Sequence, residues 1–251
     1  MKQSNNLSVV IMAAGKGTRM DSDAPKVLHK LNNKTLLNHV IDTAGCLSPE
    51  HIIIIIGYQA DLVRKSIDKK NVLFSTQDKQ KGTGHAVMQA KEHLEYFKGH
   101  TLVLSGDVPL ISKETLLSLY QNQINNNLDA CMLISEMENP EGYGRIIRDK
   151  NGYLAYVREH KDCNNQELKI KEINSGIYIF NNQILFKLLP MLDNNNFQSE
   201  YYLPDVLSII IKQKGKIGLE KTNDIVEIQG INTKQQLSEL EKKYQKYSNQ
   251  N

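Results

Sequence analysis

Residues 7–20 read LSVVIMAAGKGTRM, in which a short apolar run leads directly into a glycine loop. The apolar run is typical of a β-strand that is buried on both faces, as the strands of parallel sheets are. Gly15 and Gly17 permit positive φ angles and leave no side chain between the backbone amides and a ligand. Because successive amides of this kind bind phosphate oxygens, the stretch predicts a strand followed by a phosphate-binding loop.

The charges of this loop favour an anionic ligand, although two familiar phosphate motifs do not fit it. Lys16 and Arg19 lie within the loop, and Lys26 follows on the same connection. A Walker A motif requires Ser or Thr after Gly-Lys, and a dinucleotide fingerprint requires a third glycine where Met20 stands. That fingerprint also needs an acidic residue after the second strand, and Ile56–Tyr58 offers none. The alternatives are a nucleotide loop of a third type, or a plain turn with solvated charges.

Strand-like and helix-like segments alternate from this loop to about residue 105. The expected strands are His51–Ile56, Val72–Ser75 and Thr101–Ser105, and the expected helices are Thr35–Ala44, Ala60–Ile67 and His85–Tyr96. Such alternation predicts right-handed βαβ units and a mostly parallel sheet. The expected fold class is therefore α/β, with a Rossmann-like, doubly wound sheet.

The pattern changes after residue 128, where strands outnumber helices. The expected strands are Ala130–Ser135, Gly144–Arg148, Tyr153–Val157 and Ile170–Phe180, and helical spacing returns at Ser199–Lys212 and Lys234–Tyr247. Strands with few helices between them indicate antiparallel pairing. We therefore expect a sheet extension or flap over the first half, so that the whole sheet is mixed.

Length and composition exclude several classes of protein. The chain has 251 residues, 40% hydrophobic and 24% charged, as in a globular rather than a disordered protein. The longest apolar run, Ile52–Ile56, is too short to span a bilayer, and the N-terminal MKQSNN has no signal core. We expect a cytoplasmic protein without a membrane partner. The net charge of +3 is too small to indicate a nucleic-acid partner. Cys46, Cys131 and Cys163 match no zinc pattern and are expected to be reduced thiols.

The glycine loop together with Pro25–Leu28 resembles the signature of sugar-phosphate nucleotidylyltransferases. Further segments narrow the resemblance. They are Gln77 with KGTGHA at 81–86, GDVPL at 106–110, GYGRI at 142–146 with EHKD at 159–162, EINSGI at 172–177 and EIQGIN at 227–232. Together they resemble the uridylyltransferase domain of the bacterial N-acetylglucosamine-1-phosphate uridylyltransferase family, from Leu7 to about Tyr247. The resemblance implies the nucleotide-diphospho-sugar transferase fold with a substrate-covering subdomain.

The reaction that the resemblance implies is Mg²⁺-dependent. UTP and N-acetylglucosamine 1-phosphate would give UDP-N-acetylglucosamine and pyrophosphate, a step that feeds peptidoglycan and lipopolysaccharide precursor synthesis. The attacking phosphate monoester has a second pKa of about 6 and needs no general base. Catalysis requires instead that two anions are aligned and their charge neutralised, which suits amides, lysine and arginine. Two alternatives stay open: a related enzyme with another nucleotide or sugar phosphate, and a UTP-binding regulator without activity.

The resemblance places the nucleotide and the reacting phosphates mostly on the first half of the chain. It implies that Arg19 holds the leaving pyrophosphate and that Lys26 contacts phosphate during transfer, both as catalytic residues. It implies that Gln77 and Gly82–Thr83 read the uracil edge. The nucleotide contacts that it implies are Met12, Ala13, Ala14, Gly15, Lys26, Gln77, Gly82, Thr83, Ser105, Gly106 and Asp107.

The resemblance also implies a metal site and a sugar site. Asp107 and Asn232 would hold Mg²⁺, and such a sparse set suits this ion, which keeps waters and takes phosphate oxygens. Asp107 could instead cap a turn, and Asn232 could simply be the N-cap of the last helix. The sugar and its acetamido group would be held by Gly144, Glu159 and Asn174.

Three positions depart from the family's pattern. Ser105 stands where tyrosine is usual, Ser199 where glycine is usual and Pro204 where threonine is usual. A contact made by the backbone of residue 105 survives this change, whereas a contact made by an aromatic ring does not. The other two departures flank the expected sugar pocket, so sugar affinity is the more affected property.

The expected domains are a uridylyltransferase domain at 1–230 and a C-terminal linker helix at 231–251. Common bacterial members of the family continue into a left-handed β-helix of hexapeptide repeats, which performs acetyl transfer and trimerises. No such repeat follows Tyr247. We therefore expect a chain without the acetyltransferase domain, and a monomer.

Overall fold

The computed structural model describes residues 6–69 and 71–248. Residues 1–5, which carry most of the expectation about a signal segment, lie outside this range. The main sheet of the described residues has nine strands. They are β1 (Leu7–Met12), β4 (His51–Ile56), β5 (Leu73–Thr76), β6 (His100–Ser105), β7 (Ala130–Glu136), β8 (Arg145–Arg148), β9 (Leu154–Arg158), β10 (Glu172–Asn181) and β11 (Ile217–Lys221).

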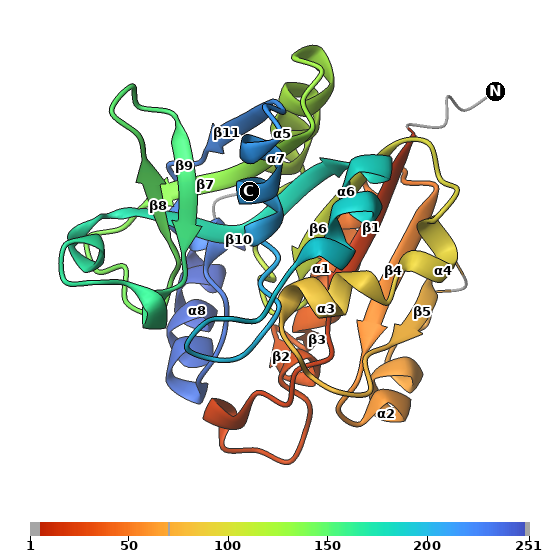
Figure 1. Ribbon diagram of the computed structural model, residues 1–251. Coiled ribbons are helices and arrows are strands. Elements are labelled where there is room, and N and C mark those ends of the chain that lie inside the picture. Colours follow the sequence, from red (N-terminus) through yellow and green to blue (C-terminus); the bar gives the residue numbers. More distant parts are fainter. Residues whose placement is uncertain (1–5, 70, 249–251) are drawn as a thin grey trace.

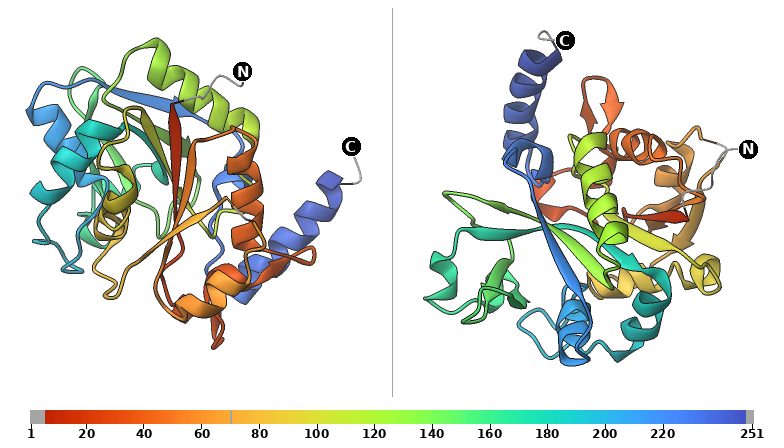
Figure 2. Two further views of the ribbon diagram at one scale, coloured as in Figure 1. Left: turned by 90° about the vertical axis from the view of Figure 1, so that its right-hand side faces the viewer. Right: turned by 90° about the horizontal axis from the view of Figure 1, so that it is seen from above.

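Helices cover both faces of this sheet (Figures 1 and 2). The α-helices are α1 (Leu36–Gly45), α2 (Ala60–Lys65), α3 (Thr83–Met88), α4 (Lys91–Leu94), α5 (Lys113–Asn125), α6 (Asn182–Leu188), α7 (Asp205–Lys212) and α8 (Lys234–Ser248). Short 3₁₀ helices are η1 (Thr18–Met20), η2 (Lys26–Leu28), η3 (His160–Asp162), η4 (Glu167–Lys169), η5 (Leu189–Met191) and η6 (Ile225–Ile228). A small second sheet pairs β2 (Lys30–Leu31) with β3 (Lys34–Thr35).

The core is divided in two by the alternation of side chains along the strands. Val9 and Ile11 of β1 point to the face that α1 and α5 cover. Val10 points to the opposite face, with α3, α6 and α7. Successive residues of a strand face opposite sides, so one apolar strand supplies both cores. This explains why the strands of the first half are continuously apolar.

The sheet is doubly wound and mixed, as the sequence predicts. Its order is β11-β7-β10-β6-β1-β4-β5, and β1 is parallel to both of its neighbours. After β1 the chain builds β4 and β5 on one side and then returns to place β6 on the other. Such a reversal opens a crevice at the carboxyl ends of the strands.

The predicted flap is also present. β10 is antiparallel to β6, β7 and β8, and β8 forms a hairpin with β9. This hairpin branches off the path of the other seven strands, on the left of Figure 1. The flap therefore adds a second wall to the crevice.

Some elements differ from the expectation. The single helix expected over His85–Tyr96 is split into α3 and α4, because Gln89 and Ala90 bond three residues back instead of four. The helix expected from Ser199 begins only at Asp205, because Ser199 has a φ of +53° and Pro204 occupies the N-cap. Three further elements, α5, α6 and β11, are not among those expected from the sequence pattern.

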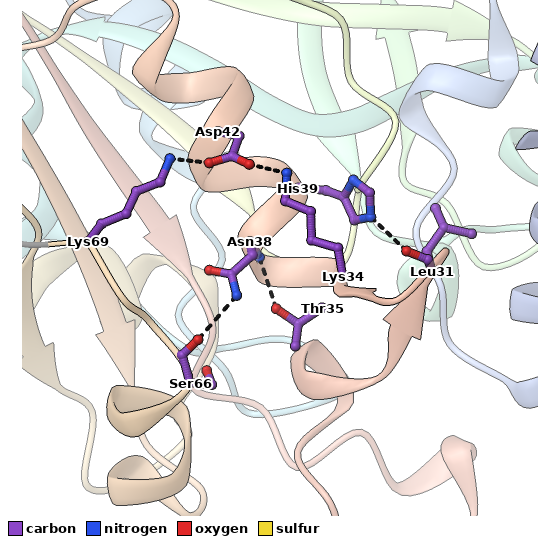
Figure 3. A network of polar contacts seen from close by, with 8 residues as sticks. All are labelled: Leu31, Lys34, Thr35, Asn38, His39, Asp42, Ser66 and Lys69. Carbon is purple, nitrogen blue, oxygen red and sulfur yellow. Dashed lines mark hydrogen bonds and ion pairs between the residues drawn. The ribbon is translucent and has the colours of Figure 1, made fainter. Parts of the chain in front are cut away.

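Polar contacts tie α1 to its surroundings (Figure 3). Asp42 on α1 accepts ion pairs from Lys34 of β3 and from Lys69 in the loop after α2. Asn38 Nδ2 donates to the carbonyl of Ser66 at 3.1 Å, and the Thr35 hydroxyl caps the helix. These contacts lie on the outer surface of the molecule and hold α1 in position behind the sheet.

The last helix, α8, packs next to the small β2–β3 sheet. Leu240 is buried there with Leu31 and Leu36, and Leu237 and Tyr244 pack against the same cluster. The three of these residues that belong to α8 lie three and four positions apart, in keeping with the helical spacing expected over Lys234–Tyr247. Among the described residues, no helix combines the length and the apolar character needed to cross a membrane.

Candidate active site

The site lies where β1 and β6 end side by side. Met12 and Ser105, the last residues of these strands, are paired in register, and the Gly106 amide donates to the Met12 carbonyl at 2.9 Å. A Cβ at Gly106 would lie only 3.1 Å from that carbonyl oxygen. The ladder therefore continues into both loops and fixes the glycine loop relative to Asp107.

A cavity of about 290 Å³ opens over these strand ends. Of the residues that the sequence predicts for the nucleotide, those lining it are Met12, Ala13, Ala14, Gly15, Lys26, Gln77, Gly82, Thr83, Ser105 and Asp107. Its wall also includes Val27, Gln80, Ala86 and Glu200, which the sequence analysis does not single out. Gly106 lies directly behind this wall.

Two glycines at or beside this cavity are required by their backbone conformation and their neighbours. Gly17 has a φ of +68°, and a Cβ there would overlap the Lys26 side chain. Gly82 has a φ of +103°, and a Cβ there would lie 2.6 Å from the Tyr201 carbonyl oxygen. Both positions combine a left-handed backbone with a close approach, which only glycine tolerates.

A cluster of cations and oxygen ligands stands at the edge of the cavity. Lys26 Nζ lies 2.5 Å from Asp107 Oδ2 and donates to Asn232 Oδ1 at 3.1 Å. Arg19 donates to the same Asn232 oxygen at 2.9 Å. The side chains of Lys26 and Asp107 are 18% and 16% exposed, so this pair is partly shielded from water.

This arrangement brings two predicted metal ligands together. One ammonium group touches both Asp107 Oδ2 and Asn232 Oδ1, so the two oxygens converge on a single cation position. An Asp carboxylate and an Asn carbonyl are hard oxygen donors of the kind that Mg²⁺ accepts. No group of three or more His, Cys, Asp or Glu side chains that could hold a metal occurs in the described ranges. The donor set present therefore fits a sparsely held ion.

A second cavity, of about 180 Å³, adjoins the first and shares Met12, Thr83 and Ser105 with it. The residues predicted for the sugar line it, namely Gly144, Glu159 and Asn174. Further lining residues are Gly142 and Tyr143 of the GYGRI segment, Ser175 and Gly176 of the EINSGI segment, and Tyr178, which lies outside the segments quoted above. Pro204, named only as a departure, completes the wall.

The carboxyl group of Glu159 has an unusual environment. Burial is the largest cause that raises its pKa to about 7, and nearby carboxylates add to the shift. These carboxylates belong to Asp205, Asp162 and Glu200. Burial likewise raises the pKa of Asp205 to about 6. The second cavity is therefore lined by an acid that titrates near neutral pH, whereas the first has a lysine at its edge.

Arg19 lies outside both cavities, in a larger cleft of about 870 Å³. Thr18, Gly142, Tyr143 and Glu159 also line this cleft, which therefore joins the glycine loop to the flap. The structure thus assembles every predicted site residue around one connected opening, with Arg19 and Asn232 at its rim.

The segment 199–204 connects the two cavities through backbone hydrogen bonds. The Tyr201 amide donates to the Lys81 carbonyl, and the Gly84 amide donates to the Tyr201 carbonyl, both at 2.8 Å. The Leu203 amide donates to the Thr83 hydroxyl oxygen at 2.9 Å. Ser199 has a left-handed backbone, which agrees with the expectation that glycine is usual at this position.

Gln77 is buried and held by its neighbours. Its Nε2 donates to the Gly82 carbonyl at 3.1 Å and lies 2.9 Å from His85 Nδ1. The His85 ring also stacks on Tyr201. These contacts give His85 a structural role in the loop that covers the first cavity.

Comparison with known proteins identifies relatives of the whole chain. A model of the family described as nucleotidyl transferase matches residues 8–221. The protein named "Bifunctional protein GlmU" of Staphylococcus saprophyticus is 46% identical over 241 residues, which are 96% of this chain and 53% of that protein. The protein of the same name from Streptococcus agalactiae is 45% identical over 93% of this chain and 50% of its own length. The chain thus spans about half the length of these relatives.

A solved structure has the same fold. UDP-glucose pyrophosphorylase complexed with UDP-glucose superimposes with a TM-score of 0.76 and covers 96% of this chain and 98% of its own, at 19% sequence identity. At that identity the likeness concerns the fold alone. Since the family match spans both the glycine loop and the flap, this chain belongs to the nucleotidyl transferase family.

Proposed function

We propose that the chain transfers the uridylyl group of UTP to N-acetylglucosamine 1-phosphate, giving UDP-N-acetylglucosamine and pyrophosphate. The observation that carries this proposal is the cluster of Lys26, Arg19, Asp107 and Asn232 beside a glycine-lined cavity and a sugar-sized one. Two anionic substrates can meet there next to fixed positive charge. The relatives at 45–46% identity support the same activity.

The cations supply what this reaction needs. A phosphate monoester is mostly dianionic near neutral pH, so it attacks without a general base. The difficulty is to bring it to a triphosphate in line and to neutralise the charge that develops. Lys26 is placed to contact the transferring phosphate, and Arg19, at the rim, to hold the leaving pyrophosphate.

The metal belongs to this proposal as well. Members of the family generally use a divalent metal ion, and we propose Mg²⁺, held by Asp107 and Asn232. When bound, the ion would neutralise phosphate charge and orient the triphosphate. Lys26 now contacts both oxygens, so we expect its ammonium to shift toward a phosphate when the ion is present.

The two cavities divide recognition between them. Met12–Gly15 would cradle the nucleotide, and Gln77 with Gly82 and Thr83 would read the uracil edge. Gly144, Glu159 and Asn174 would hold the sugar. The product is a precursor of peptidoglycan and lipopolysaccharide, so we place the chain in that biosynthesis.

The proposal is tested by measuring pyrophosphate release with four nucleoside triphosphates and several sugar 1-phosphates in the presence of Mg²⁺. UTP with N-acetylglucosamine 1-phosphate should be the preferred pair. A preference for dTTP with glucose 1-phosphate would overturn the substrate assignment. Binding of UTP without turnover at saturating Mg²⁺ would indicate a regulator instead.

A further inference from the structure

A wide irregularity in β10 shapes the second cavity. Asn174 pairs with Ile134 of β7, and Tyr178 pairs with Met132, so four steps along β10 match two steps along β7. Two extra residues therefore bulge out of the ladder between these pairs. Gly176, at a φ of +79°, lies in the bulge, and the Ser175 hydroxyl fastens it by donating to the Leu133 carbonyl at 2.7 Å.

The bulge brings together two side chains that a regular strand would keep apart. Residues four apart in a strand are separated by about 13 Å. Here the Tyr178 hydroxyl lies 2.6 Å from Asn174 Nδ2 and 2.9 Å from Oδ1. Both side chains are buried, Tyr178 at 2% and Asn174 at 7% exposure, and both line the second cavity.

The orientation of the Asn174 carboxamide is fixed by a backbone donor. The Gly176 amide donates to Asn174 Oδ1 at 2.9 Å, so this side of the group must be the oxygen. The Tyr178 hydroxyl then accepts from one Nδ2 hydrogen. The second Nδ2 hydrogen is the remaining polar group that Asn174 can present to a ligand, and it can pair only with an acceptor.

We propose that Tyr178 is a positioning residue, which holds the Asn174 carboxamide so that its Nδ2 donates to an acceptor oxygen of the bound sugar. An amide carbonyl on the sugar is the acceptor that best matches a single fixed N–H. This inference rests on the proposed function and assigns Tyr178 a role in selecting an acylamino sugar. Tyr178 acts through Asn174, because its hydroxyl is taken up by the Asn174 carboxamide and its ring is buried against Phe180.

The test is Tyr178→Phe, which removes only the hydroxyl group. The KM for N-acetylglucosamine 1-phosphate should rise about tenfold, as one lost fixed hydrogen bond predicts. The KM for UTP should change less than about twofold, and the KM for glucose 1-phosphate, which has no acyl group, should change much less than tenfold. The matched control is Tyr156→Phe, which removes a hydroxyl that donates to Glu167 at 3.0 Å, outside the two cavities.

A double-mutant cycle separates positioning from direct contact and from loss of fold. In an Asn174→Ala background, Tyr178→Phe should raise the KM for the acetylated sugar less than about twofold further. Full additivity of the two changes would overturn the proposal, as would an unchanged KM in Tyr178→Phe. A fall of Tm with equal increases in the KM of all substrates would overturn it too. If the wild-type chain shows no turnover with this sugar, the proposed function itself fails.

Discussion

The two cavities that meet at Met12 and Ser105 are built from different parts of the polypeptide. The first is lined by the glycine loop that follows β1, by the loop that carries Gly82, and by Ser105 and Asp107 at the end of β6. The second is lined by residues of the flap, among them Glu159 and Asn174, which come from separate segments of the chain. The backbone amides of a glycine loop suit phosphate groups, which are common to all nucleotides, whereas placed side chains suit a particular sugar. The difference indicates that catalysis and specificity can be altered separately in this chain.

The most severe test of this division is Asp107→Ala, next to the boundary between the cavities. Asp107 supplies one of the two oxygen atoms that converge on the cation position. Its loss should lower kcat by about 10³-fold, because the charge of the transferring phosphate is then poorly neutralised. Turnover over a Mg²⁺ titration measures the effect, with circular dichroism as the check of fold. Undiminished activity at ordinary Mg²⁺ concentration would show that the metal is held elsewhere.

Arg19→Ala examines the rim of the site. The expected loss is about 10²-fold in kcat, because this guanidinium would act on charge that develops as pyrophosphate leaves. Steady-state kinetics with each substrate varied in turn distinguishes the possibilities. A rise in the KM for UTP at constant kcat would mean that Arg19 binds ground state and transition state equally, contrary to the role proposed.

Gly17→Ala addresses the first cavity through Lys26, which lines it. The added methyl group would overlap Lys26 at a left-handed position, so kcat/KM for UTP should fall by about tenfold or more. The matched control is Gly152→Ala in the β8–β9 turn, where φ is also positive (+83°) but no atom lies within 4 Å of a Cβ. If both variants lose activity to the same extent, backbone strain alone is responsible and the overlap with Lys26 has no effect on UTP turnover.

Glu159→Gln tests the second cavity, through the affinity for the sugar phosphate and through the dependence of stability on pH. We expect the KM for the sugar phosphate to rise about tenfold while the KM for UTP is unchanged. The pKa of Glu159 is raised in the folded chain, to about 7, so the carboxyl group favours folding in its protonated form and opposes it once ionised. Stability is therefore lost as pH rises from about 4.5 to 7.

The same substitution should remove that pH dependence. The Tm of Glu159→Gln should exceed that of the wild type at pH 8 and match it near pH 5, because glutamine has no charge to bury. Differential scanning fluorimetry across this range measures the difference. A Tm of Glu159→Gln below that of the wild type at pH 8 would show that the ionised Glu159 carboxylate is stabilised in the folded chain, contrary to a raised pKa.

The smallest effect is expected at the outer surface, where Lys34 and Lys69 pair with Asp42 outside the two cavities. Asp42→Asn should leave kcat and both KM values unchanged and lower the free energy of unfolding by at most about 1 kcal/mol. Burial tends to raise the pKa of Asp42, but its hydrogen bonds and ion pairs with Lys34 and Lys69 outweigh this and lower it. The small stabilisation is thus present at neutral pH and lost in acid. Urea unfolding at pH 7 and pH 3 measures it, and altered kinetics would mean that α1 is coupled to the site.

The sequence predicts the strand and the glycine loop at the first cavity well, because their signals are local. An apolar run followed by Gly15 and Gly17 is enough to predict that a glycine loop follows β1, as it does in the structure. The alternation of strands and helices then predicts the doubly wound sheet. The helix α5 is missed because its buried stripe is sparse, with Leu116 and Leu119 among many polar residues.

The second cavity is formed by segments that are distant in the sequence, and a local sequence pattern does not show how such segments pair. Glu159 and Asn174 are expected only through the family resemblance, and Tyr178 is not expected at all. In the sequence Tyr178 is one more apolar residue of a buried strand. Its contact with Asn174 exists because β10 carries two more residues than β7 over the same length, and this mismatch is visible only once the strands are paired.

The bulge in β10 also constrains how such a chain can change by insertion and deletion. Removing two residues from 175–177 would restore the regular ladder, keep Tyr178 and Phe180 in the core and remove the wall of the second cavity. Removing one would leave an ordinary single-residue β-bulge, in which Tyr178 could still pair with Met132. The length of this segment can therefore change the wall of the second cavity while the sheet of a nucleotidyl transferase is kept.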